Sequence, residues 1–176
     1  MINIENINDD ILKIINDLNK IQYSVDEKKQ YGGWKIEYDT FYFLDNLINK
    51  IQPNVVLEFG SGLSTKLFAS HIEKGNIKEL LSIDHLSDFP DHPKTLISDK
   101  SIISKIHFFT FPIFIKKYAK KFFCFYSIPF NFFANKKQID LVFIDGPPYY
   151  YNGREAGLHS CFEHLSSNAI IILDDA

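Results

Sequence analysis

Short, mainly apolar runs recur along the chain from residue 55 onward, each bounded by polar residues or glycine. Such continuous runs, rich in β-branched residues, are typical of strands that are buried on both faces. The runs cover residues 55–59, 80–84, 106–111, 141–145 and 169–174. Because helical stretches such as residues 64–74 separate them, we predict an α/β fold with a doubly wound, mostly parallel sheet of about five strands.

Residues 1–50 carry a different, helical pattern. Isoleucine and leucine recur at helical spacing through residues 4–21, with Asn, Asp and Lys between them, which is typical of an amphipathic helix. A second helix is predicted from about Asp39 to Lys50, because Pro53 follows it. We therefore expect one globular domain in which a helical N-terminal extension, residues 1–50, precedes an α/β unit, residues 51–176.

The composition narrows the class of protein. A chain of 176 residues with 45% hydrophobic residues has the size and apolar content of one folded domain. Domains that bind nucleic acid are usually strongly basic, whereas this chain has a net charge of −3, so no nucleic-acid partner is expected. The N-terminus lacks the features of a signal peptide, no apolar run is long enough to span a membrane, and the two cysteines indicate reduced thiols. We therefore predict a cytoplasmic protein without stable membrane insertion.

One segment, residues 108–135, combines many aromatic residues with four lysines. A packing insertion with solvated lysines is the interpretation that we favour for it. A lid over a substrate and a contact with a membrane surface are the alternatives.

Acidic residues stand at or near the ends of four predicted strands: Glu58, Asp84, Asp145 and Asp174. In a doubly wound sheet, ligands bind beyond the carboxyl ends of the strands, where the strand order reverses. An acid at one strand end commonly caps the next helix or starts a turn. Four such acids favour a shared binding crevice.

The first of these strands leads into Gly60-Ser61-Gly62, and a helix follows. The glycines permit a tight turn and close approach of the backbone to a ligand. Ser64 and Thr65 stand where a nicotinamide-binding fingerprint has its third glycine, and the spacing to Lys66 is wrong for a Walker A loop. The Glu58 carboxylate would repel a pyrophosphate, but it suits S-adenosylmethionine (SAM), which carries an ammonium and a sulfonium and no phosphate.

Asp84 ends the second strand, at the distance from the loop where an acid binds the ribose hydroxyls. The segments LEFGSGLSTKLFA, LLSIDH, DLVFIDGPP and AIIILDDA, in this order, resemble a class I SAM-dependent methyltransferase over about residues 53–176. The resemblance implies a Rossmann-like fold in which Glu58, Gly60 and Gly62 hold the methionine part of SAM. It also implies that Asp84 holds the ribose. We include Ser61, Ser64 and Asp145 among the expected cofactor contacts, and the adenine contact is unassigned.

Asp145, Asp174 and Asp175 follow two strands that are neighbours in this family, and they are similar in layout to metal-dependent O-methyltransferases. Such a triad could hold Mg²⁺ or another divalent cation, which would lower the pKa of a substrate hydroxyl. In the alternative interpretation, Asp174-Asp175 caps a helix and Asp145 binds the substrate directly.

Asp145 and His85 are the predicted catalytic residues, with His85 as a candidate general base. His159 is a second candidate base. Arg154 either holds the Asp145 loop in place or clamps an anionic substrate; the first role is the one we expect.

The predicted function is transfer of a methyl group from SAM to a small polar acceptor, such as a hydroxyl of a sugar or another metabolite. The family's sheet normally has two strands beyond the fifth, so an open fifth strand predicts self-association through that edge. The alternative is a non-catalytic or truncated SAM-binding or interaction module. Glu58 and the missing third glycine argue against an oxidoreductase that uses NAD.

Overall fold

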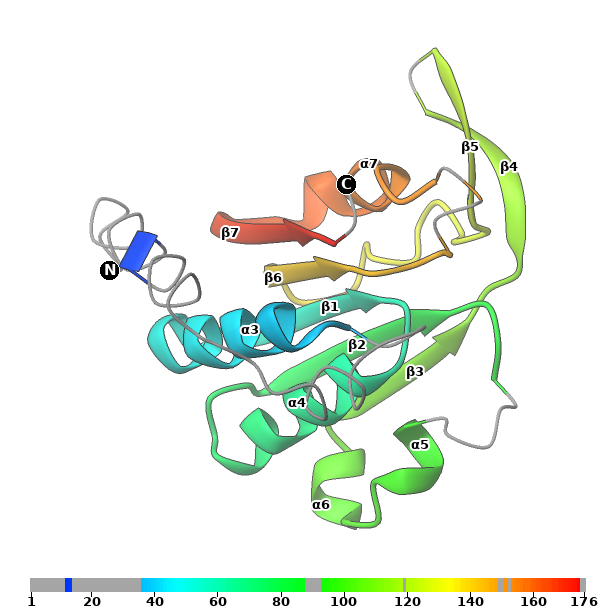
Figure 1. The fold of residues 1–176 in the computed structure, drawn as a ribbon. Coiled ribbons are helices and arrows are strands. Elements are labelled where there is room, and N and C mark those ends of the chain that lie inside the picture. Colours follow the sequence, from blue (N-terminus) through cyan, green and yellow to red (C-terminus); the bar gives the residue numbers. More distant parts are fainter. Residues whose placement is uncertain are drawn as a thin grey trace.

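The computed structural model describes residues 12–13, 36–87, 93–118, 120–148, 151 and 153–174 (Figure 1). The helices are α3 Tyr38–Ile51, α4 Leu63–Glu73, α5 Pro93–Leu96, α6 Lys100–Ile103, α7 Ala156–Cys161 and the 3₁₀ turn η2 Phe162–His164. The strands are β1 Val55–Phe59, β2 Glu79–Asp84, β3 Ile106–Thr110, β4 Ile113–Tyr118, β5 Lys121–Tyr126, β6 Ile139–Ile144 and β7 Leu165–Leu173. Of the predicted helix over residues 4–21, only Leu12 and Lys13 are among the described residues, and both are helical.

The main sheet has five strands in the order β3-β2-β1-β6-β7, and every pair in it is parallel. The chain therefore builds outward from β1 through β2 to β3, then returns to the other side of β1 with β6 and β7. This reversal confirms the predicted doubly wound α/β sheet. β7 begins at Leu165, earlier than predicted, and forms one edge of the sheet.

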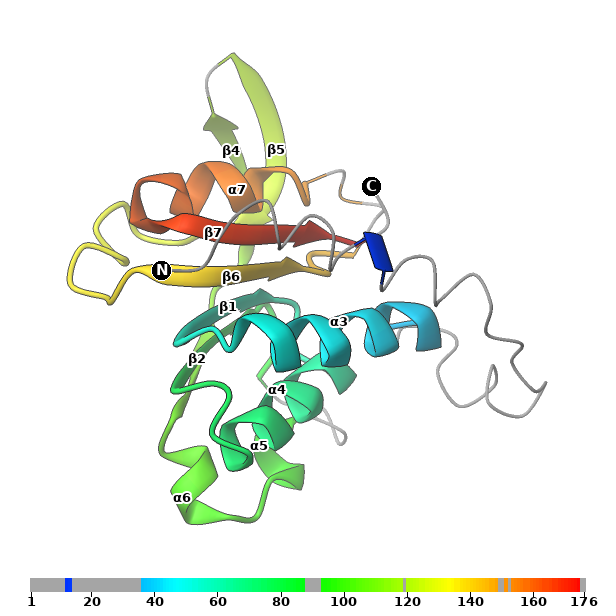
Figure 2. The same cartoon turned by 90° about the vertical axis from the view of Figure 1, so that its left-hand side faces the viewer.

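Both faces of the sheet are covered, which is why its central strands are continuously apolar. All five residues of β1 are buried. Val56 packs with Leu44 of α3 and Phe68 of α4 in one core cluster. Its neighbour Leu57 points to the opposite face, where its core cluster includes Cys161 of α7 and residues of β5. Figure 2 shows α3 and α4 apart from α7 across the sheet.

The aromatic and lysine-rich segment forms an antiparallel hairpin, β4–β5, which the sequence pattern did not predict as strands. Phe123 and Phe125 of this hairpin are buried in the core, as expected of a packing insertion. Its outer end rises away from the rest of the chain, at the upper right of Figure 1. Among the described residues, no helix combines the length and the apolar character that crossing a membrane requires.

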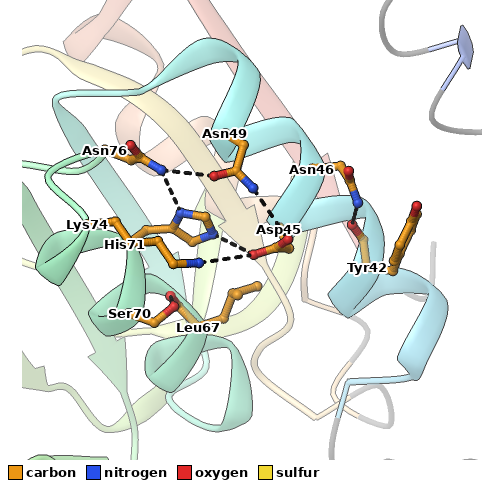
Figure 3. Close-up of polar contacts among 9 residues, drawn as sticks. All are labelled: Tyr42, Asp45, Asn46, Asn49, Leu67, Ser70, His71, Lys74 and Asn76. Carbon is orange, nitrogen blue, oxygen red and sulfur yellow. Dashed lines mark hydrogen bonds and ion pairs between the residues drawn. The ribbon is translucent and has the colours of Figure 1, made fainter.

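A polar cluster around the buried side chain of His71 ties α3 to α4 (Figure 3), and we call it the His71 cluster: His71, Asp45, Asn76 and Asn49. His71 is fully buried, and its Nε2 lies 3.0 Å from Asp45 Oδ1. The Asn76 amide nitrogen donates to His71 Nδ1 at 3.1 Å and to Asn49 Oδ1 at 3.0 Å. Because an amide nitrogen only donates, Nδ1 accepts and Nε2 carries the proton, so the imidazole is neutral. Burial lowers the pKa of His71 and so favours this neutral form.

Candidate functional site

The predicted acids gather at one edge of the sheet, at the carboxyl ends of the strands. Glu58 is the penultimate residue of β1 and Asp84 is the last residue of β2. Asp145 and Asp174 directly follow β6 and β7. The strand order reverses between β1 and β6, so this edge is the topological switch point at which ligands bind in such sheets.

Gly60 begins the loop between β1 and α4, and it lies against the turn that follows β6. Its φ is +97°, a left-handed conformation that favours glycine. A Cβ atom there would lie 3.0 Å from the carbonyl carbon of Asp145 and 3.1 Å from the nitrogen of Gly146. A side chain at position 60 would therefore strain the loop and push the two turns apart.

Glu58 lies beneath this loop and is fully buried. Its carboxylate accepts hydrogen bonds from the Ser64 hydroxyl at 2.5 Å, the Thr65 hydroxyl at 2.7 Å and the Ser82 hydroxyl at 2.6 Å. The Ser82 hydroxyl is also 2.7 Å from the Ser61 hydroxyl. We call these five residues the Glu58 cluster. Burial raises the pKa of Glu58 to about 7, against the opposing effect of the three hydroxyls.

The backbone amides of the loop are satisfied within the protein. Gly60 N donates to Ile83 O at 2.8 Å, Ser61 N to Asp84 Oδ2 at 2.7 Å, and Gly62 N to the Thr65 hydroxyl at 2.9 Å. A pyrophosphate bound at a glycine loop needs amides that point to it. The donors of this loop do not fit a dinucleotide, whereas SAM carries no phosphate and requires none of them.

Asp84 connects the loop to the residues after β2. Its Oδ1 accepts from the backbone nitrogens of His85 at 2.6 Å and Leu86 at 3.0 Å. His85 Nδ1 lies 2.9 Å from the same oxygen, although not at a hydrogen-bonding angle. Asp84 Oδ2 accepts the one bond from Ser61 N that is described above. Since each carboxylate oxygen can accept two hydrogen bonds, Oδ2 has capacity for a ligand hydroxyl.

Tyr126, the last residue of β5, is a site residue that the sequence did not predict. It is fully buried, and its ring stacks on Phe59 with centroids 6.0 Å apart. A Cβ atom on Gly146 would overlap its hydroxyl, so the phenol fills the space beside the Asp145 turn. Burial, with Asp84 and Asp145 nearby, raises its pKa well above the ordinary value. Its phenol is therefore neutral at physiological pH and able to donate a hydrogen bond.

Arg154 holds together the turns that follow β6 and β7. Its Nε donates to Pro147 O at 3.1 Å and its Nη1 to Asp174 O at 2.7 Å. Its Nη2 lies 3.3 Å from Asp145 Oδ1, and both side chains are largely buried. The structure thus confirms the expected role of Arg154 in holding the Asp145 loop.

The predicted metal triad is only partly described, because Asp175 lies outside the described residues. Asp174 Oδ1 accepts a hydrogen bond from the Thr40 hydroxyl of α3 at 3.2 Å. A cation on Asp145 would compete with the Arg154 guanidinium for the same carboxylate oxygen. Within the part of the chain that the structure describes, no three His, Cys, Asp or Glu side chains could hold a metal ion together.

The alternative base, His159, lies away from this edge. Its ring stacks on Tyr118 with centroids 5.7 Å apart and contacts Phe123 at 5.9 Å. It is exposed, and its ring packs against the β4–β5 hairpin through these two aromatic contacts.

The chain matches the model of one protein family and is similar in fold to a solved structure. The family model of a methyltransferase domain matches residues 57–176. A crystal structure of a methyltransferase from Geobacter sulfurreducens superposes with a TM-score of 0.57 at 19% identity, covering 93% of this chain and 70% of that chain. At this identity the likeness shows the fold alone. None of the curated proteins compared with the chain matches it.

Proposed function

This chain belongs to the methyltransferase-domain family and is a class I SAM-dependent methyltransferase, and we propose that it methylates a hydroxyl of a small polar acceptor, such as a sugar. The observation that carries this proposal is the glycine loop whose amides are satisfied internally, next to Asp84 and Asp145. Such a loop suits a ligand without phosphate, and the two acids lie at the switch point.

The proposed cofactor contacts are the backbone of Gly60, Ser61 and Gly62, the Asp84 carboxylate and Asp145. Asp84 Oδ2, which has capacity for one more hydrogen bond, would accept it from a ribose hydroxyl. Glu58 and Ser64 act differently, because the Glu58 carboxylate is fully buried and the Ser64 hydroxyl bonds to it. We propose that this pair supports the loop from below.

When bound, SAM supplies a methyl group on a sulfonium, ready for attack by an oxygen. Transfer to an acceptor hydroxyl would exchange the carbon–sulfur bond for a carbon–oxygen bond and would leave the hydroxyl proton to be taken up by a residue of this chain. We assign this proton to His85 Nε2, because the Asp84 carboxylate, 2.9 Å from Nδ1, would stabilise the positive charge that the ring gains with the proton. Asp145, held by Arg154, would accept a hydrogen bond from the acceptor and align it.

A divalent cation bound by Asp145, Asp174 and Asp175 is the alternative way to activate the acceptor, and no step above runs through it. The proposed chemistry, with His85 as the base, requires no metal to activate the hydroxyl. We expect turnover to be unchanged after EDTA treatment. Loss of activity that Mg²⁺ restores would instead assign the three aspartates as ligands.

Calorimetric titration with SAM tests the cofactor site. We expect micromolar binding that Asp84→Ala weakens by more than about tenfold, because the carboxylate both holds Ser61 and would bind the ribose. Asp99→Ala is the matched control, since Asp99 is an exposed acid that caps α6. No SAM binding by the folded chain, or equal loss in both variants, would contradict the assignment.

The chemical step is tested by release of S-adenosylhomocysteine during a screen of hydroxyl acceptors. His85→Ala is expected to reduce kcat by about 100-fold or more while SAM affinity stays the same. SAM binding without turnover on any acceptor would favour the alternative, a non-catalytic SAM-binding module. Equal kcat in the variant and the wild type would remove His85 as the base.

A further inference from the structure

The β4–β5 hairpin has two ends with different environments. At its inner end, Ile113 pairs with Tyr126, which lies at the functional site. At its outer end, Tyr118 pairs with Lys121, and Figures 1 and 2 both show this end rising away from the sheet and helices. The inner end is accounted for by core packing. At the outer end Tyr118 stacks on His159 of α7, whereas the opposite face, which carries Ile115 and Phe122, is exposed.

Two large apolar side chains are exposed on one face of the outer end. Ile115 is 72% exposed and Phe122 is 69% exposed. Ile115 pairs with Cys124 and Phe122 pairs with Lys117, so the two are diagonal neighbours on the same face. Contiguous exposed apolar surface of this kind marks a contact site more often than an isolated exposed residue does.

Lysines surround this apolar pair. The whole hairpin, residues 113–126, contains four lysines and no acidic residue, although the chain has a net charge of −3. Lys116 Nζ donates to Ile128 O at 2.8 Å, but Lys117, Lys120 and Lys121 are exposed. Lys117 Nζ lies 5.5 Å from the centre of the Phe122 ring. The positive charge is thus concentrated where the apolar side chains are exposed.

We propose that the outer end of the hairpin docks on an anionic lipid surface. Ile115 and Phe122 would enter the boundary between headgroups and acyl chains, while the exposed lysines contact anionic headgroups. A second copy of the chain fits less well, because a two-fold contact between hairpins would set these lysines against each other. The proposal does not depend on the identity of the methyl acceptor.

Co-sedimentation with vesicles tests the docking. The wild type is expected to bind phosphatidylcholine vesicles that contain about 30% phosphatidylglycerol, to bind neutral vesicles at least about tenfold less, and to dissociate in about 0.5 M NaCl. The double variant Ile115→Ser with Phe122→Ser should lose more than about tenfold of this binding. Phe130→Ser is the matched control, because Phe130 is fully exposed outside the hairpin.

The charge contribution is tested separately. Lys117→Gln with Lys121→Gln is expected to weaken binding about 25-fold, at about fivefold per lysine. Lys100→Gln with Lys105→Gln, two exposed lysines outside the hairpin, should leave binding unchanged. All variants change exposed side chains, so circular dichroism should show the wild-type fold.

Three results would overturn the proposal. One is no sedimentation with either kind of vesicle. Another is equal binding to neutral and anionic vesicles. The third is self-association in solution that the Ile115→Ser and Phe122→Ser variant abolishes, which would assign the surface to a second copy of the chain.

Discussion

The Glu58 cluster and the His71 cluster both bury a titratable side chain completely, at two different places in the fold. Glu58 lies at the carboxyl end of β1, surrounded by hydroxyls of the loop, of α4 and of β2. His71 lies between α3 and α4, where it contacts the Asp45 carboxylate and the Asn76 amide, and this amide also donates to Asn49. In each case burial favours the neutral form, but neutral means protonated for Glu58 and deprotonated for His71.

Each cluster contains one fully buried titratable side chain, but the place of each cluster in the fold gives it a different role. The partners of Glu58 are residues of the glycine loop and its supports, so a change at Glu58 is transmitted to the ligand site. The partners of His71 join two helices, so a change there affects stability alone. The opposite protonation also gives the two clusters opposite dependence on pH.

The largest effect is expected from Glu58→Ala. This change leaves three buried hydroxyls without their common acceptor, so we expect a loss of about 4 kcal/mol in the free energy of unfolding. Because the loop loses its support, SAM affinity should fall by about tenfold or more. Urea unfolding and calorimetry measure the two effects, and a stability loss with unchanged SAM affinity would contradict the proposed support of the loop.

The next largest effect is the change of the free energy of unfolding with pH that Glu58 causes. Its pKa of about 7 in the folded state exceeds the ordinary 4.5, so its contribution to stability is fully present below pH 4.5 and lost as the pH rises through 7. The difference corresponds to about 3 kcal/mol. Glu58→Gln should remove this decline when urea unfolding is compared with the wild type between pH 4.5 and 8. An identical decline in both proteins would show that Glu58 does not titrate in this range.

A smaller effect is expected from His71→Ala. Loss of the bonds to Asp45 and Asn76 should destabilise the fold by about 2 kcal/mol, with SAM affinity unchanged. Since the pKa of His71 is lowered in the folded state, its contribution is present above pH 6.5 and is lost as the pH falls below that value. The variant should lack this acid sensitivity in urea unfolding. A drop in SAM affinity would contradict the separation of the two clusters.

The smallest effect is expected at the rim of the His71 cluster. Lys74 Nζ lies 3.9 Å from Asp45 Oδ1, and the lysine side chain is 54% exposed. Exposed ion pairs contribute little because solvent screens them, so Lys74→Ala should change unfolding free energy by no more than about 0.5 kcal/mol. Thermal unfolding measures it, and a loss comparable to that of His71→Ala would show that the lysine contributes to stability as much as the buried histidine does.

The sequence alone was enough to predict the sheet and the edge at which the site lies. Continuous apolar runs identified every strand of the parallel sheet. For the central strands β1, β2 and β6 the reason is that strands buried on both faces need apolar side chains on both. The acids that end these strands were placed correctly at one edge, because parallel strands all end there. The β4–β5 hairpin was missed, since its lysines interrupt the apolar pattern and its outer end is exposed.

Only the tertiary structure decided which way the site residues face and with what they pair. Glu58 was expected beside the ligand, but hydroxyls from α4 and β2 hold it beneath the loop. Asp145 pairs with Arg154, and Tyr126 reaches the site from a hairpin outside the sheet. Periodicity along a chain reports which positions are buried, because burial repeats with the local geometry of helix and strand. It does not report partners that lie far apart in sequence, because these meet only once the sheet and its coverings have assembled.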